Sequence, residues 1–177
     1  MFSTFIKHAA LRSRVSAVAL LLLALPLVAL AQSFPKILEG DELTRVVPSS
    51  FYFEGQSAPT QMRNAAAVQF GASRFTMAAL VDASGYSSEV QAKYQGFFIT
   101  DSPIMIEGVR LGTGAYGFGF TKNGRMTIMD VGGRRLFFVR SHRDAGLQRP
   151  RPLMMTMAAH DGVRLYNGRD YVTLLGR

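Results

Sequence analysis

Four consecutive residues, Ser141-His142-Arg143-Asp144, bring together a hydroxyl, an imidazole and a carboxylate, the three groups of a hydrolytic triad. In a triad these groups converge from separate parts of the fold, because side chains adjacent in sequence rarely point at one another. Only His142 and His160 follow the N-terminal segment discussed below. We interpret the four residues as a solvated loop with Arg143 and Asp144 on its surface, and we predict no catalytic residue. Catalysis would require a concave site in which one of these histidines meets a carboxylate.

The stretch 134–151 carries a dense positive charge, with six arginines and one histidine against a single acidic residue, Asp144. Clustered guanidinium groups bind phosphates and carboxylates through paired hydrogen bonds. The stretch is therefore predicted to bind an anionic partner, although a run of charges is also typical of an ordinary solvated surface. The arginines are Arg134, Arg135, Arg140, Arg143, Arg149 and Arg151.

Three aromatic residues in 114–120 alternate with small residues, so in a strand the rings share one face. Core packing of these rings is one interpretation of the pattern. The alternative is a calycin-like carrier of a small ligand, with the rings lining its cavity, but the chain has no tryptophan and so lacks the lipocalin G-x-W signature. The small face, with its glycines, predicts a bend or the close approach of another backbone. The aromatic residues are Tyr116, Phe118 and Phe120, opposite Ala115, Gly117 and Gly119.

A soft-metal site would be suggested by Met154, Met155 and Met157 together with His160, because thioethers favour Cu(I). Alternation in a strand places Met155 and Met157 on one face and the other two residues on the opposite face. Methionine is also an ordinary core residue. The sequence has no cysteine and shows no zinc cluster or calcium loop, so we predict neither a metal nor a cofactor.

Two-residue turns are the clearest signal for the elements that must position these groups. Asn-Gly, Asp-Gly and Gly-Gly pairs reach positive φ at low cost, as tight hairpin turns require. Such pairs occur at 123–124, 132–133, 161–162 and 167–168, and Glu107-Gly108 is a weaker case. The strands predicted around them are 103–106, 109–111, 114–121, 125–131, 134–140, 153–160, 163–166 and 170–175, preceded by 50–54, 66–70, 75–82 and 94–100.

The form S-x-x-Q at 88–91 predicts a short helix over 89–94. Segments 57–64 and 141–152 contain proline and are predicted to be loops. Many short strands with frequent turns predict an all-β fold: a single antiparallel β-sandwich or small barrel built from hairpins, with at most one short helix.

The N-terminus has the features of a cleavable secretory signal over residues 1–31. Lys7, Arg12 and Arg14 precede an apolar run of 15 residues at 17–31, which ends in Ala-Leu-Ala. A membrane-spanning helix needs about 20 apolar residues, and this run contains Pro26. We therefore expect Sec-type export to the periplasm or the medium, with no membrane-spanning segment after the signal.

Residues 32–177 are then predicted to form one β-rich domain. Cleavage would remove three of the 20 basic residues and none of the 12 acidic ones, so the net charge falls from +8 to +5. Without cysteine, stability has to come from the core alone. Nucleic acid is not expected as a partner, because the chain has an export signal and no recognised nucleic-acid-binding motif. No oligomeric state is predicted.

Three segments resemble small uncharacterised exported bacterial β-rich proteins, which are domains of unknown function. They are 79–86 (ALVDASGY), 94–100 (YQGFFIT) and 111–118 (LGTGAYGF). The last is similar to an L-P-A-G-x-Y hairpin, with Gly112-Thr113 in place of proline and alanine. The resemblance spans about the middle third of the domain. It implies export and a β fold, and it assigns no site residue.

The sequence thus favours a non-enzymatic exported β-domain protein that binds an anionic envelope surface or polymer. The small-ligand carrier is the alternative, and a central cavity would distinguish it from a filled core.

Overall fold

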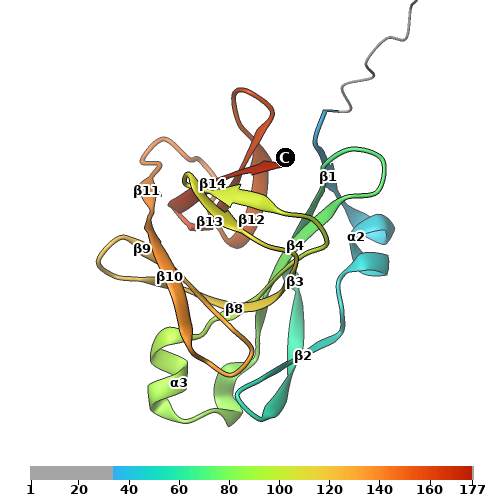
Figure 1. Ribbon diagram of the computed structural model, residues 1–177. Coiled ribbons are helices and arrows are strands. Elements are labelled where there is room, and N and C mark those ends of the chain that lie inside the picture. Colours follow the sequence, from blue (N-terminus) through green and yellow to red (C-terminus); the bar gives the residue numbers. More distant parts are fainter. Residues whose placement is uncertain (1–33, 177) are drawn as a thin grey trace, which may run out of the picture. The chain divides into compact units, whose positions relative to one another are not determined.

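The computed structural model describes residues 34–176, so the predicted signal at 1–31 lies outside the described residues. Between these limits the chain consists mainly of antiparallel strands in two sheets, joined by short turns and a few short helices (Figure 1). The all-β prediction is confirmed. Within this part of the chain, no helix is long and apolar enough to cross a membrane.

The larger sheet has eight strands in the order β1-β3-β4-β5-β8-β9-β10, and β2 pairs with the first part of β3. β10 stands at the end of this order and pairs with β9. The strands are β1 (Lys36–Leu38), β2 (Ser50–Phe53), β3 (Gln56–Gln69), β4 (Phe75–Val81), β5 (Gly96–Thr100), β8 (Gly114–Thr121), β9 (Arg125–Met129) and β10 (Arg135–Arg140).

The smaller sheet has the order β12-β13-β14-β6-β7, and β11 pairs with β14. β6 and β11 follow one another along the same edge of β14, because β6 pairs with its end and β11 with its beginning. The strands are β6 (Ile104–Ile106), β7 (Val109–Leu111), β11 (His142–Arg143), β12 (Arg151–Met157), β13 (Gly162–Gly168) and β14 (Asp170–Gly176).

One hydrophobic core joins the two sheets. Phe98 and Phe118 of the larger sheet pack in the same buried cluster as Leu165 and Val172 of the smaller sheet, and all four are fully buried. A second cluster, which includes Phe97, covers the other face of the larger sheet beneath β2 and helix α3 (Ser88–Lys93). Strand β5 is therefore buried on both faces, which explains why its sequence is apolar without alternation.

The turn signals positioned most strands correctly. Glu107 and Gly108 have φ of +47° and +80° between the paired residues Ile106 and Val109, as a two-residue hairpin requires. The turn predicted at Asp161-Gly162 lies one residue earlier, with positive φ at His160 and Asp161. Gly162 instead pairs with Leu175 in the sheet.

Segment 57–64, predicted to be a loop, is part of β3. Pro59 pairs with Ser50 of β2, and its carbonyl accepts the N–H of Asp82. A proline is tolerated in a strand where its missing N–H is not needed for the ladder. A further hairpin turn at Glu54-Gly55, with φ of +45° and +85°, closes β2 onto β3.

The helix predicted over 89–94 is confirmed as α3, although Ser87 rather than Ser88 caps it by accepting the N–H of Val90. A second helix, α2 (Gly40–Val46), was not predicted, and a short 3-10 turn, η1 (Ala83–Gly85), precedes α3. The residue before α2, Glu39, makes no side-chain cap, so the sequence carries no capping signal there.

Candidate functional site

The predicted arginines do not form a single compact cluster. Arg134 and Arg135 lie at the start of β10, whereas Arg140 lies at its end. Five strand residues at about 3.3 Å each separate Arg135 from Arg140 by about 17 Å. At this spacing one small anion cannot contact the arginines at both ends of β10. An extended partner that runs along the strand can.

Two of the arginines have carboxylate partners. Arg134 Nε lies 3.0 Å from Asp130 Oδ2, and Arg143 Nη1 lies 3.2 Å from Asp170 Oδ1. The backbone N–H of Arg134 also bonds the Asp130 carboxylate and, as the largest cause, lowers the pKa of that group. These two arginines are therefore partly neutralised within the fold.

The other four arginines are exposed, and none has an ion-pair partner among residues 34–176. We call this set the arginine surface. It comprises Arg135, Arg140, Arg149 and Arg151.

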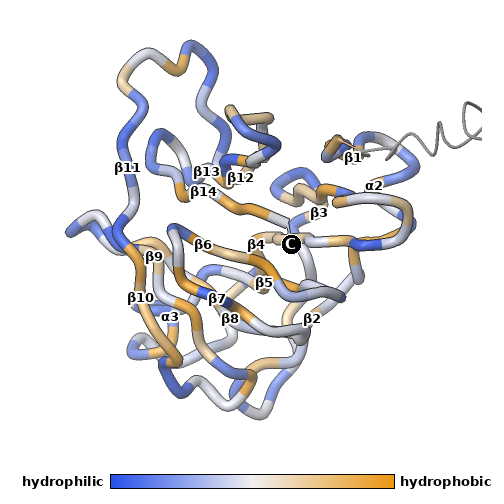
Figure 2. Tube along the Cα trace, turned by 45° about the horizontal axis from the view of Figure 1, so that its top comes forward, coloured by the Kyte–Doolittle hydropathy of each residue, from blue (hydrophilic) through white to orange (hydrophobic). Residues whose placement is uncertain are grey.

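Strand β10 also exposes apolar side chains. Leu136 is 41% exposed and Phe138 is 47% exposed. The Arg125 guanidinium lies over the Phe138 ring at 4.5 Å from its centroid, and Arg125 pairs with Arg140 across the two strands. We call Arg125, Leu136, Phe138 and Arg140 the β10 face. Figure 2 shows the hydrophobic stretch of β10 leading into the hydrophilic segment that contains β11.

Arg125 was not predicted as part of the site, yet the sequence holds a signal for it. A hairpin closed by Gly132-Gly133 puts Arg125 opposite Arg140. The structure has this pairing, because a register shift between Arg135 and Phe137 compensates for a turn one residue longer.

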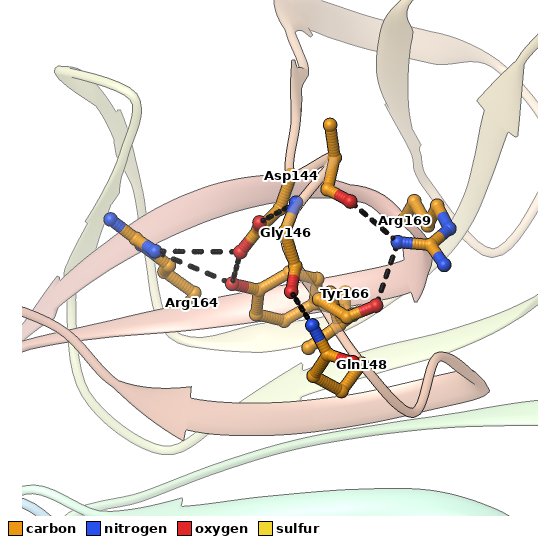
Figure 3. A network of polar contacts seen from close by, with 8 residues as sticks. Asp144, Gly146, Gln148, Arg164, Tyr166 and Arg169 are labelled. Atoms are coloured by element: carbon orange, nitrogen blue, oxygen red, sulfur yellow. Dashed lines mark hydrogen bonds and ion pairs between the residues drawn. The ribbon is translucent and has the colours of Figure 1, made fainter.

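Within the predicted loop 141–152, the segment 144–150 is anchored to β13 and to the turn between β13 and β14 (Figure 3). The half-buried Asp144 carboxylate accepts the Tyr166 hydroxyl at 3.0 Å and the Gly146 N–H at 3.1 Å. Arg169 Nη1 donates to the carbonyls of Ala145 and Leu147 at 3.0 and 2.7 Å. Asp144 is thus the centre of a polar network and not a surface charge. The anchored loop contains Arg149 and leads directly into Arg151.

The structure does bring His142 to a carboxylate. Its Nε2 lies 3.0 Å from Glu107 Oε2, and its ring packs against Tyr171 with centroids 5.4 Å apart. The other Glu107 oxygen accepts the backbone N–H of Thr173. A carboxylate in this position orients the imidazole, and here it also ties β11 to the β6–β7 turn. The neighbouring Ser141 uses its backbone N–H to bond Gly124 at the end of the β8–β9 turn. The other histidine, His160, is an exposed turn residue.

The aromatic face of β8 packs into the core. Phe118 is fully buried, and Tyr116 and Phe120 pack against the same cluster while partly exposed. On the opposite face, a Cβ at Gly119 would lie 2.1 Å from the Lys93 carbonyl oxygen, so another backbone does approach closely there. Core packing therefore accounts for the alternation, and the alternative of a ligand cavity gains no support from these three rings.

A pocket with a volume of about 570 Å³ lies elsewhere in the described residues. It is lined by side-chain amides, among them Gln61, Gln91, Gln95 and Asn167, and by apolar residues such as Leu80 and Pro152. None of the predicted site residues contributes to it.

The four residues considered for a soft metal have different environments. Met155 is buried in the core, whereas Met157 is 46% exposed and His160 occupies a turn. In residues 34–176, no three His, Cys, Asp or Glu side chains converge in a way that could hold a metal ion.

Comparison of the chain with protein-family models, with curated proteins and with solved structures gives no match.

Proposed function

We propose that this protein is an exported, non-enzymatic binding protein that contacts an anionic partner through its arginine surface. The observation that carries the proposal is the exposure of Arg135, Arg140, Arg149 and Arg151 without carboxylate partners in the described residues. A guanidinium group that has no partner within the fold keeps its donors available for phosphate or carboxylate groups.

The anchoring of segment 144–150 supports the same function. Its backbone is held by Asp144 and Arg169 through several hydrogen bonds. A partner that binds next to it therefore does not have to order a free loop, which would cost conformational entropy.

Export is part of the proposal and is based on the signal predicted over residues 1–31. In the cell envelope, a positively charged domain encounters anionic polymers and surfaces in abundance. The net charge of +5 expected after cleavage of three basic residues favours such contacts.

The test is retention of residues 32–177 on immobilised heparin, a polymer of sulfate and carboxylate groups, with elution by a salt gradient. The double variant Arg140→Ser/Arg149→Ser should elute at clearly lower salt, because it loses two guanidinium contacts. The control Arg63→Ser/Arg110→Ser removes the same charge from exposed positions on β3 and β7. Equal elution shifts for the two variants would show that net charge alone governs retention and would refute the assigned surface.

A further inference from the structure

Strand β10 has one unpaired edge. It is the end strand of the larger sheet, and β9 is its hydrogen-bonding neighbour among the described strands. Figure 1 shows β10 beside β9, with β11 continuing from its end. An unpaired edge offers a row of backbone donors and acceptors to any extended chain that approaches.

The register identifies which backbone groups face this edge. The Ser141 N–H donates to the Gly124 carbonyl at 2.9 Å, next to the pair Arg140–Arg125. Hydrogen-bonded and non-hydrogen-bonded pairs alternate along an antiparallel ladder. Val139 therefore bonds to β9, whereas the N–H and C=O groups of Phe138 and Arg140 point away from β9 to the free edge.

The side chains beside this edge determine which kind of strand could pair with it. Leu136 and Phe138 supply exposed apolar surface, and Arg135 and Arg140 place a positive charge near each end of the strand. A second copy of β10 carries the same two arginine ends and no acidic residue, so it offers Arg135 and Arg140 no carboxylate. A strand with acidic residues has the complementary charge.

We propose that the free edge of β10 accepts an acidic, extended segment of another polypeptide as an added strand. The backbone of Phe138 and Arg140 bonds the incoming segment, and the arginines pair with its carboxylates. The inference rests on the proposed function, because it names the class of the anionic partner.

Backbone pairing can be tested apart from charge at a single position. Phe138→Pro removes the N–H that faces the free edge and leaves the bonds of Val139 to β9 in place, a position at which strands tolerate proline. Phe138→Ala is the matched control, since it removes the same ring but keeps the N–H. The probe is a short synthetic peptide in which glutamate alternates with valine.

The peptide should bind the Phe138→Pro variant about fivefold more weakly than the Phe138→Ala variant, as expected for the loss of one hydrogen bond. Arg140→Ser, added to either variant, should weaken peptide binding further. In the wild-type protein, the peptide should slow amide hydrogen exchange at Phe138 and Arg140, and this measurement needs no variant to fold. Equal affinities for the proline and alanine variants, or no protection of these two amides, would overturn the inference.

The heparin experiment separates the two proposals. If the arginine surface controls heparin retention but the peptide does not bind, the proposed function stands and the added strand is refuted. If vesicles containing phosphatidylglycerol bind the protein and the peptide does not, the partner is a lipid surface and the inference is again wrong. If the Arg140→Ser variant self-associates and does not bind the peptide, the arginines only prevent β10 from pairing with a second copy.

Discussion

Glu107 and His142, which are 35 positions apart in the sequence, meet at 3.0 Å between carboxylate Oε2 and imidazole Nε2. The second carboxylate oxygen accepts the N–H of Thr173 on β14. The same strand pairs with β6 on one side of Thr173 and with β11 on the other. The side chain of Glu107 thus lies between β6 and β11, which pair with the same edge of β14.

Replacing this carboxylate should loosen the edge of β14. Glu107→Ala leaves the Thr173 N–H and His142 without their acceptor, so we expect a loss of about 1–3 kcal/mol in the free energy of unfolding. Urea denaturation gives this value, and amide exchange at Thr173 should become faster. Glu89→Ala, at an exposed position on α3, is the control and should cost a few tenths of a kcal/mol. Equal effects of the two variants would contradict the bridging role.

The close contact between β8 and the end of α3 predicts a strong effect of a single methyl group. A Cβ at Gly119 would lie 2.1 Å from a backbone oxygen, so Gly119→Ala should destabilise the fold by about 3 kcal/mol. In Gly112→Ala the nearest atom would be 3.9 Å away, an ordinary contact, and this variant should be almost neutral. Thermal unfolding of both variants is the measurement, and a Gly119→Ala protein as stable as Gly112→Ala would be the contrary result.

Tyr94 is a buried residue whose hydroxyl has no hydrogen-bond partner in the described part of the chain. Because an unpaired buried hydroxyl is costly, Tyr94→Phe should leave stability unchanged or raise it. Tyr86 packs against the Tyr94 ring, but its hydroxyl donates to the Gln56 carbonyl at 3.0 Å. Tyr86→Phe should therefore cost about 1 kcal/mol in the free energy of unfolding by urea. A larger loss for Tyr94→Phe than for Tyr86→Phe would mean that the Tyr94 hydroxyl has a partner in solution.

Tyr94 also makes the stability of the fold depend on pH in the alkaline range. Burial raises the pKa of its phenol above the usual 10.0, so the folded state keeps a proton that the unfolded state releases. The stability that this group contributes is fully present below the unfolded pKa and falls as pH rises through the window above it. The urea midpoint should consequently drop above about pH 10, and it should drop less steeply in Tyr94→Phe. Identical slopes for the two proteins would exclude Tyr94 as the cause.

Most of the fold could be predicted because the turns are local in sequence. Glycine beside asparagine, aspartate, glycine or glutamate marked five hairpins, and the strands between them followed. Besides β1 and η1, three elements were missed, and these three have physical reasons. Pro59 made the first half of β3 read as a loop, α2 lacks a capping side chain, and β11 is only two residues long and exists through its pairing with β14.

The candidate site could be predicted only in part. The arginines are visible as a run, but the contact of Arg125 with Phe138 depends on the register of β9 and β10. The meeting of Glu107 with His142 depends on both residues reaching β14 from distant parts of the chain. The contact of Glu107 with His142 is fixed by tertiary packing, which no local pattern encodes, whereas the pairing of Arg125 with Arg140 follows from a local hairpin turn.

The position of β14 inside the smaller sheet has a consequence for biosynthesis. β6, β11 and β13 all pair with this one strand, residues 170–176. A nascent chain that has not yet reached these residues lacks the template for that sheet, and half of the shared core stays open. We therefore expect the larger sheet and its second cluster to form first, and the smaller sheet to complete the shared core only after synthesis has passed residue 176.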